Sequence, residues 1–342
     1  MKKMDEQPKV IYPHDLSCFK YERSDDEVDR SSILDTLELH FAKGETSVAV
    51  HGDEGIGKTT VLNQFISRYK KDSIGIFLNA VNGQSYAQDN IIIDLYRQAS
   101  YYLNDEESKN FQEAGKRDLA KVFYFLEIFL QKKGKFLYLI IDGLSDIPKR
   151  DHYIVDEIID LLPFTSRHIK ILLSVDNEEN LGKLVSKKIM RFEMLVFSKH
   201  ETKLLLPDVD ESTIDSLMRV FPAVPGNLKI IKRLISSGMS AETILQDYSS
   251  TSGSRDLYEA EWNRSKNVDD SSFEVLAIAA FSISPVSMES LQNIFSKSTE
   301  EIERLSDHFG YIDLSAELSS NLVFRDLIKQ HPDCLYPPRF RL

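Results

Sequence analysis

Two patterns of hydrophobic positions alternate along the chain up to residue 198. Short runs of β-branched and aliphatic residues predict buried strands, and longer segments with one apolar face predict amphipathic helices. Phe136–Asp142 is the most apolar run, and its continuous hydrophobicity is typical of a strand buried on both faces of a parallel sheet. The alternation therefore predicts an α/β domain with parallel strands. The predicted strands are Thr46–His51, Ile74–Val81, Phe136–Asp142, His168–Val175 and Phe192–Phe197, and the predicted helices are Glu27–Ala42, Val61–Tyr69, Asp89–Leu103, Arg117–Leu130 and Tyr153–Leu162.

The pattern changes after this domain. Three short helices follow without a strand between them, and a polar loop then precedes three helices, two short strands and a last helix, an order that suits a winged helix. We therefore expect an irregular lead over residues 1–25, the α/β domain over 26–206, a helical domain over 207–254 and a winged-helix domain over 255–342. The predicted elements are helices at Glu211–Val220, Leu228–Ser236 and Ala241–Tyr248, the loop Ser249–Arg255, helices at Phe273–Phe281, Ser287–Phe295 and Thr299–Phe309, strands near Tyr311–Leu314 and Leu322–Phe324, and a helix at Asp326–Gln330.

Composition narrows the classes of function. Lys plus Arg number 42 and Asp plus Glu 54, which gives a formal net charge of −12 and makes the chain a poor general binder of nucleic acid. Cys18 and Cys334 show no C-x-x-C spacing, so neither a zinc site nor a disulfide framework is predicted, and a reducing compartment is indicated. The apolar stretches are too short to span a membrane, and the start MKKMDEQPKV lacks the apolar region of a signal peptide. We expect a cytoplasmic protein.

The segment between the first predicted strand and the next helix carries the strongest chemical signal. It fits G-x-x-x-x-G-K-[ST] without a mismatch, and a β-branched strand and an amphipathic helix flank it as the motif requires. Consecutive backbone N–H groups in such a loop face the phosphates; Lys58 would reach the β- and γ-phosphate oxygens, and the Thr59 hydroxyl would ligate Mg²⁺. The chain is therefore predicted to bind a nucleotide. The predicted phosphate-binding residues are Gly52, Asp53, Glu54, Gly55, Ile56, Gly57, Lys58, Thr59 and Thr60.

A second element of this chemistry is an apolar strand that ends in a carboxylate near the metal. Phe136–Ile141 followed by Asp142 meets that description. The motif alone is weak evidence for a metal-binding carboxylate, because many buried strands end in an aspartate that only caps a loop. It is stronger evidence when, as here, the strand follows a complete phosphate loop in the sequence. We predict that Asp142 supports Mg²⁺ together with Thr59, and we predict no other metal site.

Four segments resemble STAND NTPases, the NACHT- and NB-ARC-like signalling ATPases. IIDGLSD, Ile140–Asp146, resembles their extended metal-site motif, and Phe192–Leu206 is similar to the strand, turn and helix that leave their core domain. Phe221–Leu228 looks like their Gly-x-Pro segment, with Pro225 at the proline. Val323–Ile328 resembles their Met-His-Asp-Leu segment, with Arg325 at the histidine position. The resemblance implies an AAA+-like P-loop core with a parallel sheet, followed by a helical domain and a winged-helix domain.

The resemblance also implies a function and further site residues. It implies a switch in which ATP and ADP, with Mg²⁺, control domain opening and self-association, and in which hydrolysis is slow. The trigger and the effector are unknown, and either could be a protein. Lys58, Asp142 and Asp146 would be catalytic, with Asp146 orienting the attacking water. Pro225 and Arg325 would contact the nucleotide, although Arg325 could equally pair with Asp326 and cap its own helix.

Two residues depart from the family pattern. Ser145 stands where a carboxylate is common, and Asp176 replaces an arginine that would sense the γ-phosphate. Both changes weaken the prediction of fast hydrolysis and leave the prediction of binding unchanged. Two alternatives stay open: an AAA+ DNA loader of the origin-recognition type, which also joins a phosphate loop to a winged helix, and a scaffold that binds nucleotide without hydrolysing it, which Ser145 and Asp176 favour. Adenine is favoured over guanine only because no N-K-x-D motif is present.

Overall fold

The computed structural model describes residues 11–19, 21, 27–78, 87–104, 111–147, 151–176, 182–236, 238–248, 286–302, 312–313 and 317–320. The chain divides into two compact units. One consists of Met1–Asp53 and Gly57–Leu195, and the other of Glu54–Ile56 and Val196–Leu342. The finer boundaries at residues 206 and 254 stay predictions.

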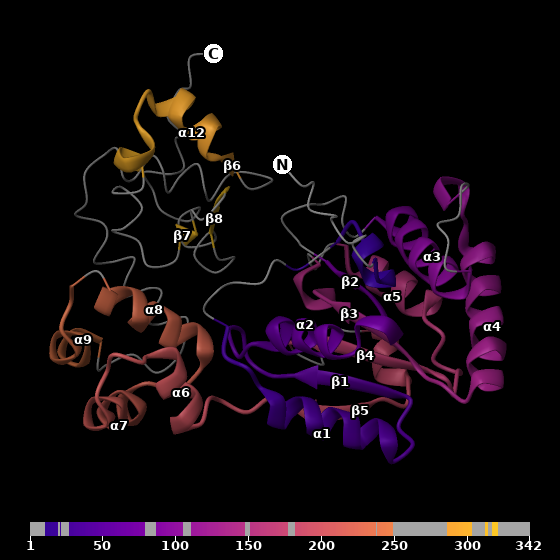
Figure 1. The fold of residues 1–342 in the computed structure, drawn as a ribbon, viewed down its shortest axis with the longest axis horizontal. Coiled ribbons are helices and arrows are strands. Elements are labelled where there is room, and N and C mark those ends of the chain that lie inside the picture. The colour runs from indigo at the N-terminus through magenta and orange to yellow at the C-terminus, as the bar shows by residue number, and fades with distance from the viewer. Residues whose placement is uncertain are drawn as a thin grey trace, which may run out of the picture. The chain divides into compact units, whose positions relative to one another are not determined.

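A five-stranded parallel sheet forms the centre of the first unit (Figure 1). Its strands are β1 (Ser47–His51), β2 (Ser73–Phe77), β3 (Leu137–Asp142), β4 (Ile169–Val175) and β5 (Met190–Glu193), in the spatial order β2-β3-β4-β1-β5. All neighbouring strands are parallel, so their carboxyl ends lie at one edge of the sheet. This arrangement confirms the predicted α/β fold and places the loops after β1, β3 and β4 together.

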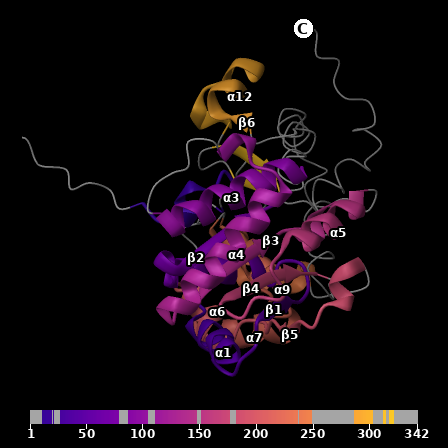
Figure 2. The ribbon, with the colours of Figure 1, turned by 90° about the vertical axis from the view of Figure 1, so that its right-hand side faces the viewer.

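Helices cover both faces of this sheet (Figure 1). Helices α1 (Ser31–Ala42) and α2 (Lys58–Arg68) pack on one face, and α3 (Gln88–Asn104), α4 (Lys116–Lys133) and α5 (His152–Leu161) cover the other. Figure 2 shows α3 and α4 side by side in front of the strands.

The buried strand β3 shows why both layers form. Leu139 and Ile141 join the hydrophobic cluster under α3, α4 and α5, and the intervening Ile140 is equally buried. Successive side chains of a strand point to opposite faces, so a continuous apolar run needs a helix layer on each side.

The predicted start of α1 and the predicted bounds of β5 are among those that differ from the structure, and hydrogen bonds explain the start of α1. Helix α1 begins at Ser31 because the side chain of Gln64 binds the preceding backbone: its amide donates to the Val28 carbonyl at 2.9 Å and accepts from the Arg30 N–H at 3.0 Å. Strand β5 ends at Glu193. One further ladder bond, from Met194 N–H to the His51 carbonyl at 2.8 Å, follows the strand.

The second unit contains α6 (Lys199–Leu205), which the prediction placed in the α/β domain, and the three predicted short helices, α7 (Glu211–Val220), α8 (Pro225–Ser236) and α9 (Ala241–Tyr248). Side chains cap two of them: Ser198 and Glu201 form a capping box on α6, and Asp210 accepts from the N–H groups of Ser212 and Thr213 on α7. Helix α8 starts three residues earlier than predicted, at Pro225, because proline suits the first turn of a helix.

The C-terminal part of the second unit is described only in pieces. Strands β6 (Val286–Ser287), β7 (Ile312–Asp313) and β8 (Glu317–Ser320) form an antiparallel sheet in the order β6-β8-β7, and α12 (Met288–Phe295) follows β6. The predicted strand Leu322–Phe324 and the predicted helices Phe273–Phe281 and Asp326–Gln330 lie outside the described residues. The winged helix therefore stays a prediction. None of the helices in the described ranges is long and apolar enough to cross a membrane.

Candidate nucleotide-binding site

The loop between β1 and α2 has a backbone that only glycine adopts readily. Gly52, Gly55 and Gly57 have φ angles of 151°, 77° and 93°, in the range that strains residues with a side chain. Gly57 is the N-cap of α2, and no side chain caps that end of the helix. The first N–H groups of α2 therefore remain as donors for an anion, and the positive end of the helix dipole favours one.

Lys58 lies across this loop. Its Nζ donates to the carbonyl oxygens of Gly52 at 2.7 Å and Asp53 at 3.0 Å, and it lies 2.5 Å from Oδ1 of Asp176. The Lys58 side chain is only 10% exposed. The Lys58 ammonium group therefore lies against the phosphate loop, and a phosphate oxygen could replace the Asp176 carboxylate as its partner.

Asp142, at the end of β3, is buried beside the start of α2. It is 4% exposed, accepts a hydrogen bond from the Ser174 hydroxyl through Oδ1, and is hydrogen-bonded to the side chain of Thr59. Burial raises the pKa of Asp142, although these two hydrogen bonds and the charge of Lys58 oppose the rise. The two predicted Mg²⁺ ligands, Thr59 and Asp142, are therefore brought together.

This donor set fits a nucleotide phosphate with its metal ion. Within the described residues, no group of three or more His, Cys, Asp or Glu is placed to hold a metal alone. An ion beside Thr59 and Asp142 would thus complete its coordination with phosphate and water oxygens, which is how Mg²⁺ is usually held.

Gly143 explains why glycine follows this aspartate. Its φ is 80°, and a Cβ atom there would lie 2.3 Å from the carbonyl oxygen of Leu78. The Leu78 N–H donates to the Asp142 carbonyl at 3.0 Å, and the Gly143 N–H donates to Ser174 Oγ at 3.3 Å. A larger residue would displace the backbone that positions Asp142.

Asp176 follows the β4 residue that pairs with His51, the last residue of β1. Its N–H donates to the Ser145 hydroxyl at 2.8 Å, and its carboxylate pairs with Lys58. The sequence predicts an effect of Asp176 on hydrolysis alone. That interpretation is too narrow, because Asp176 contacts the lysine predicted to bind phosphate.

Asp146 belongs to a short 3₁₀ helix, Leu144–Asp146, that follows Gly143. Its side chain lies outside what the structure describes. Its role in orienting water therefore stays a prediction.

Tyr21 is a residue of this site that the sequence did not indicate. Its hydroxyl is hydrogen-bonded to the side chain of Thr60, and its ring lies 5.9 Å from that of Phe77. Burial raises the pKa of Tyr21 to about 12, so the phenol stays protonated; it accepts from the Thr60 hydroxyl and can donate to the Glu27 carboxylate. Tyr21 lies in an irregular segment without periodicity, so no sequence signal could have placed it here.

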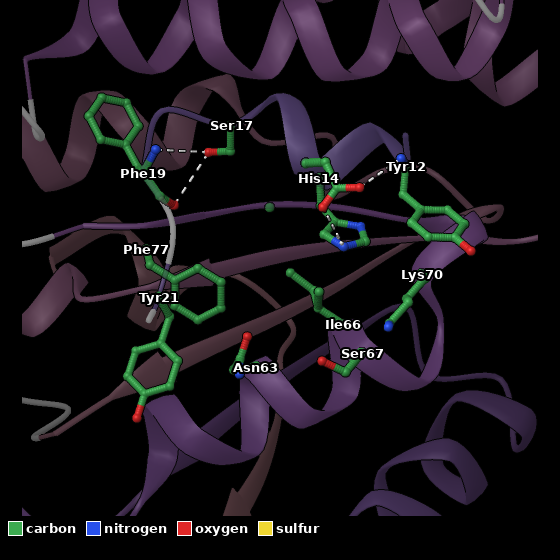
Figure 3. Close-up of a pocket in the computed structure, with 12 residues that line it drawn as sticks. Tyr12, His14, Ser17, Phe19, Tyr21, Asn63, Ile66, Ser67, Lys70 and Phe77 are labelled. Atoms are coloured by element: carbon green, nitrogen blue, oxygen red, sulfur yellow. Dashed lines mark hydrogen bonds and ion pairs between the residues drawn. The ribbon is translucent and has the colours of Figure 1, made fainter. Parts of the chain in front are cut away.

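A separate pocket of about 360 Å³ lies between this N-terminal segment, the outer face of α2 and β2 (Figure 3). Tyr21 lines one end of it and is the link to the phosphate loop through Thr60. The other lining residues are Tyr12, His14, Asp15, Ser17, Phe19, Asn63, Ile66, Ser67, Lys70, Gly75 and Phe77. No residue of Gly52–Thr59 lines the pocket, so it adjoins the candidate nucleotide-binding site at Tyr21 and does not include the phosphate loop.

The second unit includes part of the phosphate loop, Glu54–Ile56, and the segment around Pro225. The Gly226 N–H donates to the Gly55 carbonyl at 2.9 Å, and a Cβ atom on Gly226 would lie 3.1 Å from Gly55 Cα. Pro225, predicted to contact the nucleotide, therefore precedes a residue that touches the loop. Arg325 lies outside the described residues, and its role stays a prediction.

Comparison with known proteins identifies the fold. No family model matches the sequence, and no curated protein matches it. Among solved structures, a STAND protein with a tetratricopeptide repeat sensor from Pyrococcus horikoshii aligns with 95% of this chain at 14% identity and a TM-score of 0.55. This chain spans 44% of the length of that protein.

Two other solved structures align over most of this chain. A Walker-type ATPase of Pyrococcus abyssi covers 92% of this chain and 99% of its own at 13% identity, with a TM-score of 0.49. The Orc2 protein of Aeropyrum pernix covers 90% and 96% at 12% identity, with a TM-score of 0.42. We base the assignment on the first match together with the strand order and the phosphate loop. The chain has a P-loop NTPase fold, similar to that of this STAND protein.

Proposed function

We propose that this protein is a nucleotide-dependent switch of the STAND class. The observation that carries the proposal is the arrangement around Lys58, in which a glycine loop, the N-terminus of α2 and the Thr59–Asp142 pair lie together. This arrangement supplies N–H donors, one cation and two oxygen ligands, which are the groups that bind a nucleoside phosphate with Mg²⁺.

Hydrolysis of ATP by this site is expected to be slow. Lys58 would compensate the phosphate charge, Thr59 and Asp142 would hold Mg²⁺, and the metal would polarise the phosphate oxygens. Asp146 is the acidic residue proposed to orient water, because Ser145 uses its hydroxyl to accept from the Asp176 N–H. A site in which Asp146 alone is proposed to orient water favours a long-lived bound nucleotide over rapid turnover.

The switch itself requires different contacts to ADP and ATP in two arrangements of the chain. Pro225 and Arg325 are proposed to contact the nucleotide in the closed arrangement, and exchange of ADP for ATP is proposed to permit self-association. The hydrogen bond from Gly226 to the Gly55 carbonyl supports this proposal, since it ties the Pro225 segment to the phosphate loop.

Light scattering after size exclusion tests the switch. We expect a monomer with ADP and a larger species with a slowly hydrolysed triphosphate analogue, and no response to either nucleotide from Lys58→Ala. The same mass with ADP and with the analogue, for wild-type protein that binds both, would contradict the switch and leave nucleotide binding intact.

Arg325→Ala tests the proposed closing contact. A guanidinium near the phosphates adds a charge-assisted bond available only in the closed form, so we expect ADP to dissociate about tenfold faster from the variant. Stopped-flow displacement of a fluorescent ADP measures this rate. If Arg325 only caps its own helix, the variant loses thermal stability and releases ADP at the wild-type rate.

A scaffold that binds nucleotide without hydrolysing it is the second candidate. The observation in its favour is the Ser145–Asp176 hydrogen bond, which places a hydroxyl where the family usually has a carboxylate. Tight binding of ATP without release of phosphate over many hours would favour the scaffold over the slow ATPase.

A further inference from the structure

We propose that Asp176 makes the site discriminate against nucleoside triphosphates, by competing with the terminal phosphate for Lys58. The inference rests on the proposed nucleotide binding and adds a specificity-determining residue to it. Its basis is the 2.5 Å contact between Asp176 Oδ1 and Lys58 Nζ, just beyond the end of β4.

The carboxylate takes a place that an anionic phosphate oxygen would otherwise take. Two of the Lys58 contacts are to backbone carbonyl oxygens of its own loop, at Gly52 and Asp53, and the third is to Asp176. An ammonium group has three N–H donors, so these three acceptors use all of them. A phosphate oxygen that binds Lys58 must therefore displace one acceptor, and Asp176 is the one on a separate side chain.

Asp176 competes for Lys58 mainly with the terminal phosphate. The backbone N–H groups of the loop and of the start of α2 supply the contacts to the β-phosphate, so that group depends less on Lys58. Asp176 stands outside the loop, at the end of β4. A γ-phosphate bound to Lys58 would lie beside a carboxylate of the same sign.

When a phosphate oxygen displaces Asp176 from Lys58, the carboxylate also loses its ion-pair partner. The ion pairs of the described residues give Asp176 one cation, Lys58, and the N–H of Asp176 is already bonded to Ser145. The carboxylate is 40% exposed, so water replaces part of the lost interaction and screens the repulsion. The result is a graded preference for diphosphate, and a cation at this position would have the opposite effect.

Calorimetric titration of Asp176→Asn tests the proposal. The probes are ADP and a slowly hydrolysed triphosphate analogue, each with Mg²⁺, and the quantity compared is the ratio of their Kd values. We expect the variant to bind the triphosphate about tenfold more tightly and to change its ADP affinity less than about threefold.

Asp160→Asn is the matched control. Asp160 also pairs with a lysine, Lys183, and both side chains are about half exposed, but neither belongs to the phosphate site. The same charge change there should leave the Kd ratio at its wild-type value. This control separates a local effect of Asp176 from a change in the net charge of the protein.

An unchanged ratio in Asp176→Asn would overturn the proposal and leave nucleotide binding standing. Weaker triphosphate binding by the variant would also overturn it, because Asp176 would then assist the metal or the phosphate. If wild type and Asp176→Asn, both shown to be folded, bind neither nucleotide, the proposed function fails and this inference fails with it.

Discussion

The ends of the neighbouring strands β3 and β4 each bring an aspartate to the phosphate loop, and the two differ in burial and partners. Asp142 is 4% exposed and is bonded to the hydroxyls of Ser174 and Thr59. Asp176 is 40% exposed and pairs with Lys58. The comparison teaches that position at a strand end does not decide the role of a carboxylate. Burial and fixed donors make Asp142 a permanent part of the site, and exposure makes Asp176 exchangeable.

Removing the lysine should have the largest effect, because Lys58 interacts with both aspartates. We expect Lys58→Ala to weaken nucleotide binding at least about a hundredfold, since the phosphate charge loses its compensating cation. Calorimetry on the variant, with circular dichroism to show that it is folded, measures the loss. Wild-type affinity in a folded variant would reject the phosphate-loop assignment.

The next test separates the two aspartates. Asp142→Asn should abolish the contribution of Mg²⁺ to nucleotide binding, because a neutral amide binds the metal poorly. The affinity for nucleotide in the presence of Mg²⁺ should fall about tenfold or more. Asp176→Asn should keep the Mg²⁺ dependence. Titrations with and without EDTA measure both variants. If both variants lose the Mg²⁺ dependence equally, the two carboxylates share one role.

A third carboxylate sharpens the assignment of roles. Asp146→Asn should lower the single-turnover rate about tenfold or more while changing affinity little, because orienting water matters mainly in the transition state. Phosphate release after mixing with limiting ATP measures the rate. Turnover at the wild-type rate would place the water-positioning group elsewhere.

The smallest expected effect concerns stability and its dependence on pH. Burial raises the pKa of Asp142 above its value of 3.8 in the unfolded chain, so the folded state binds the proton more tightly. Wild-type stability should therefore fall as pH rises from about 4 through the raised pKa. The Asp142→Asn protein should not lose this stability as pH rises, because an asparagine side chain does not ionise.

The nucleotide-free Asp142→Asn protein should accordingly melt at a higher temperature than wild type at pH 8, with a smaller difference at pH 5. Asp176→Asn, at the exposed position, serves as the comparison and should show no such gain. Scanning calorimetry at the two pH values measures all three proteins. A lower Tm for Asp142→Asn at pH 8 would mean that the charged form of Asp142 stabilises the fold.

The parts of the site that could be predicted from sequence are those set by the backbone. The apolar run before Asp142 and the β-branched strand before Gly52 predict two strand ends, and parallel strands bring such ends together. The contact between Asp176 and Lys58 depends on side-chain directions and on the register of β4 against β1, which the sequence pattern does not encode. The same holds for Gln64, whose side-chain amide binds the backbone just before Ser31, where α1 begins.

The nucleotide that accompanies the purified protein tests the central claim most directly. Denaturing the protein and separating the released small molecules by chromatography identifies and counts them. We predict an adenine nucleotide, mainly ADP, because the phosphate loop binds diphosphate and Asp176 disfavours the triphosphate. Protein that carries no nucleotide, and that binds neither ADP nor ATP with Mg²⁺ in calorimetry, would contradict the account.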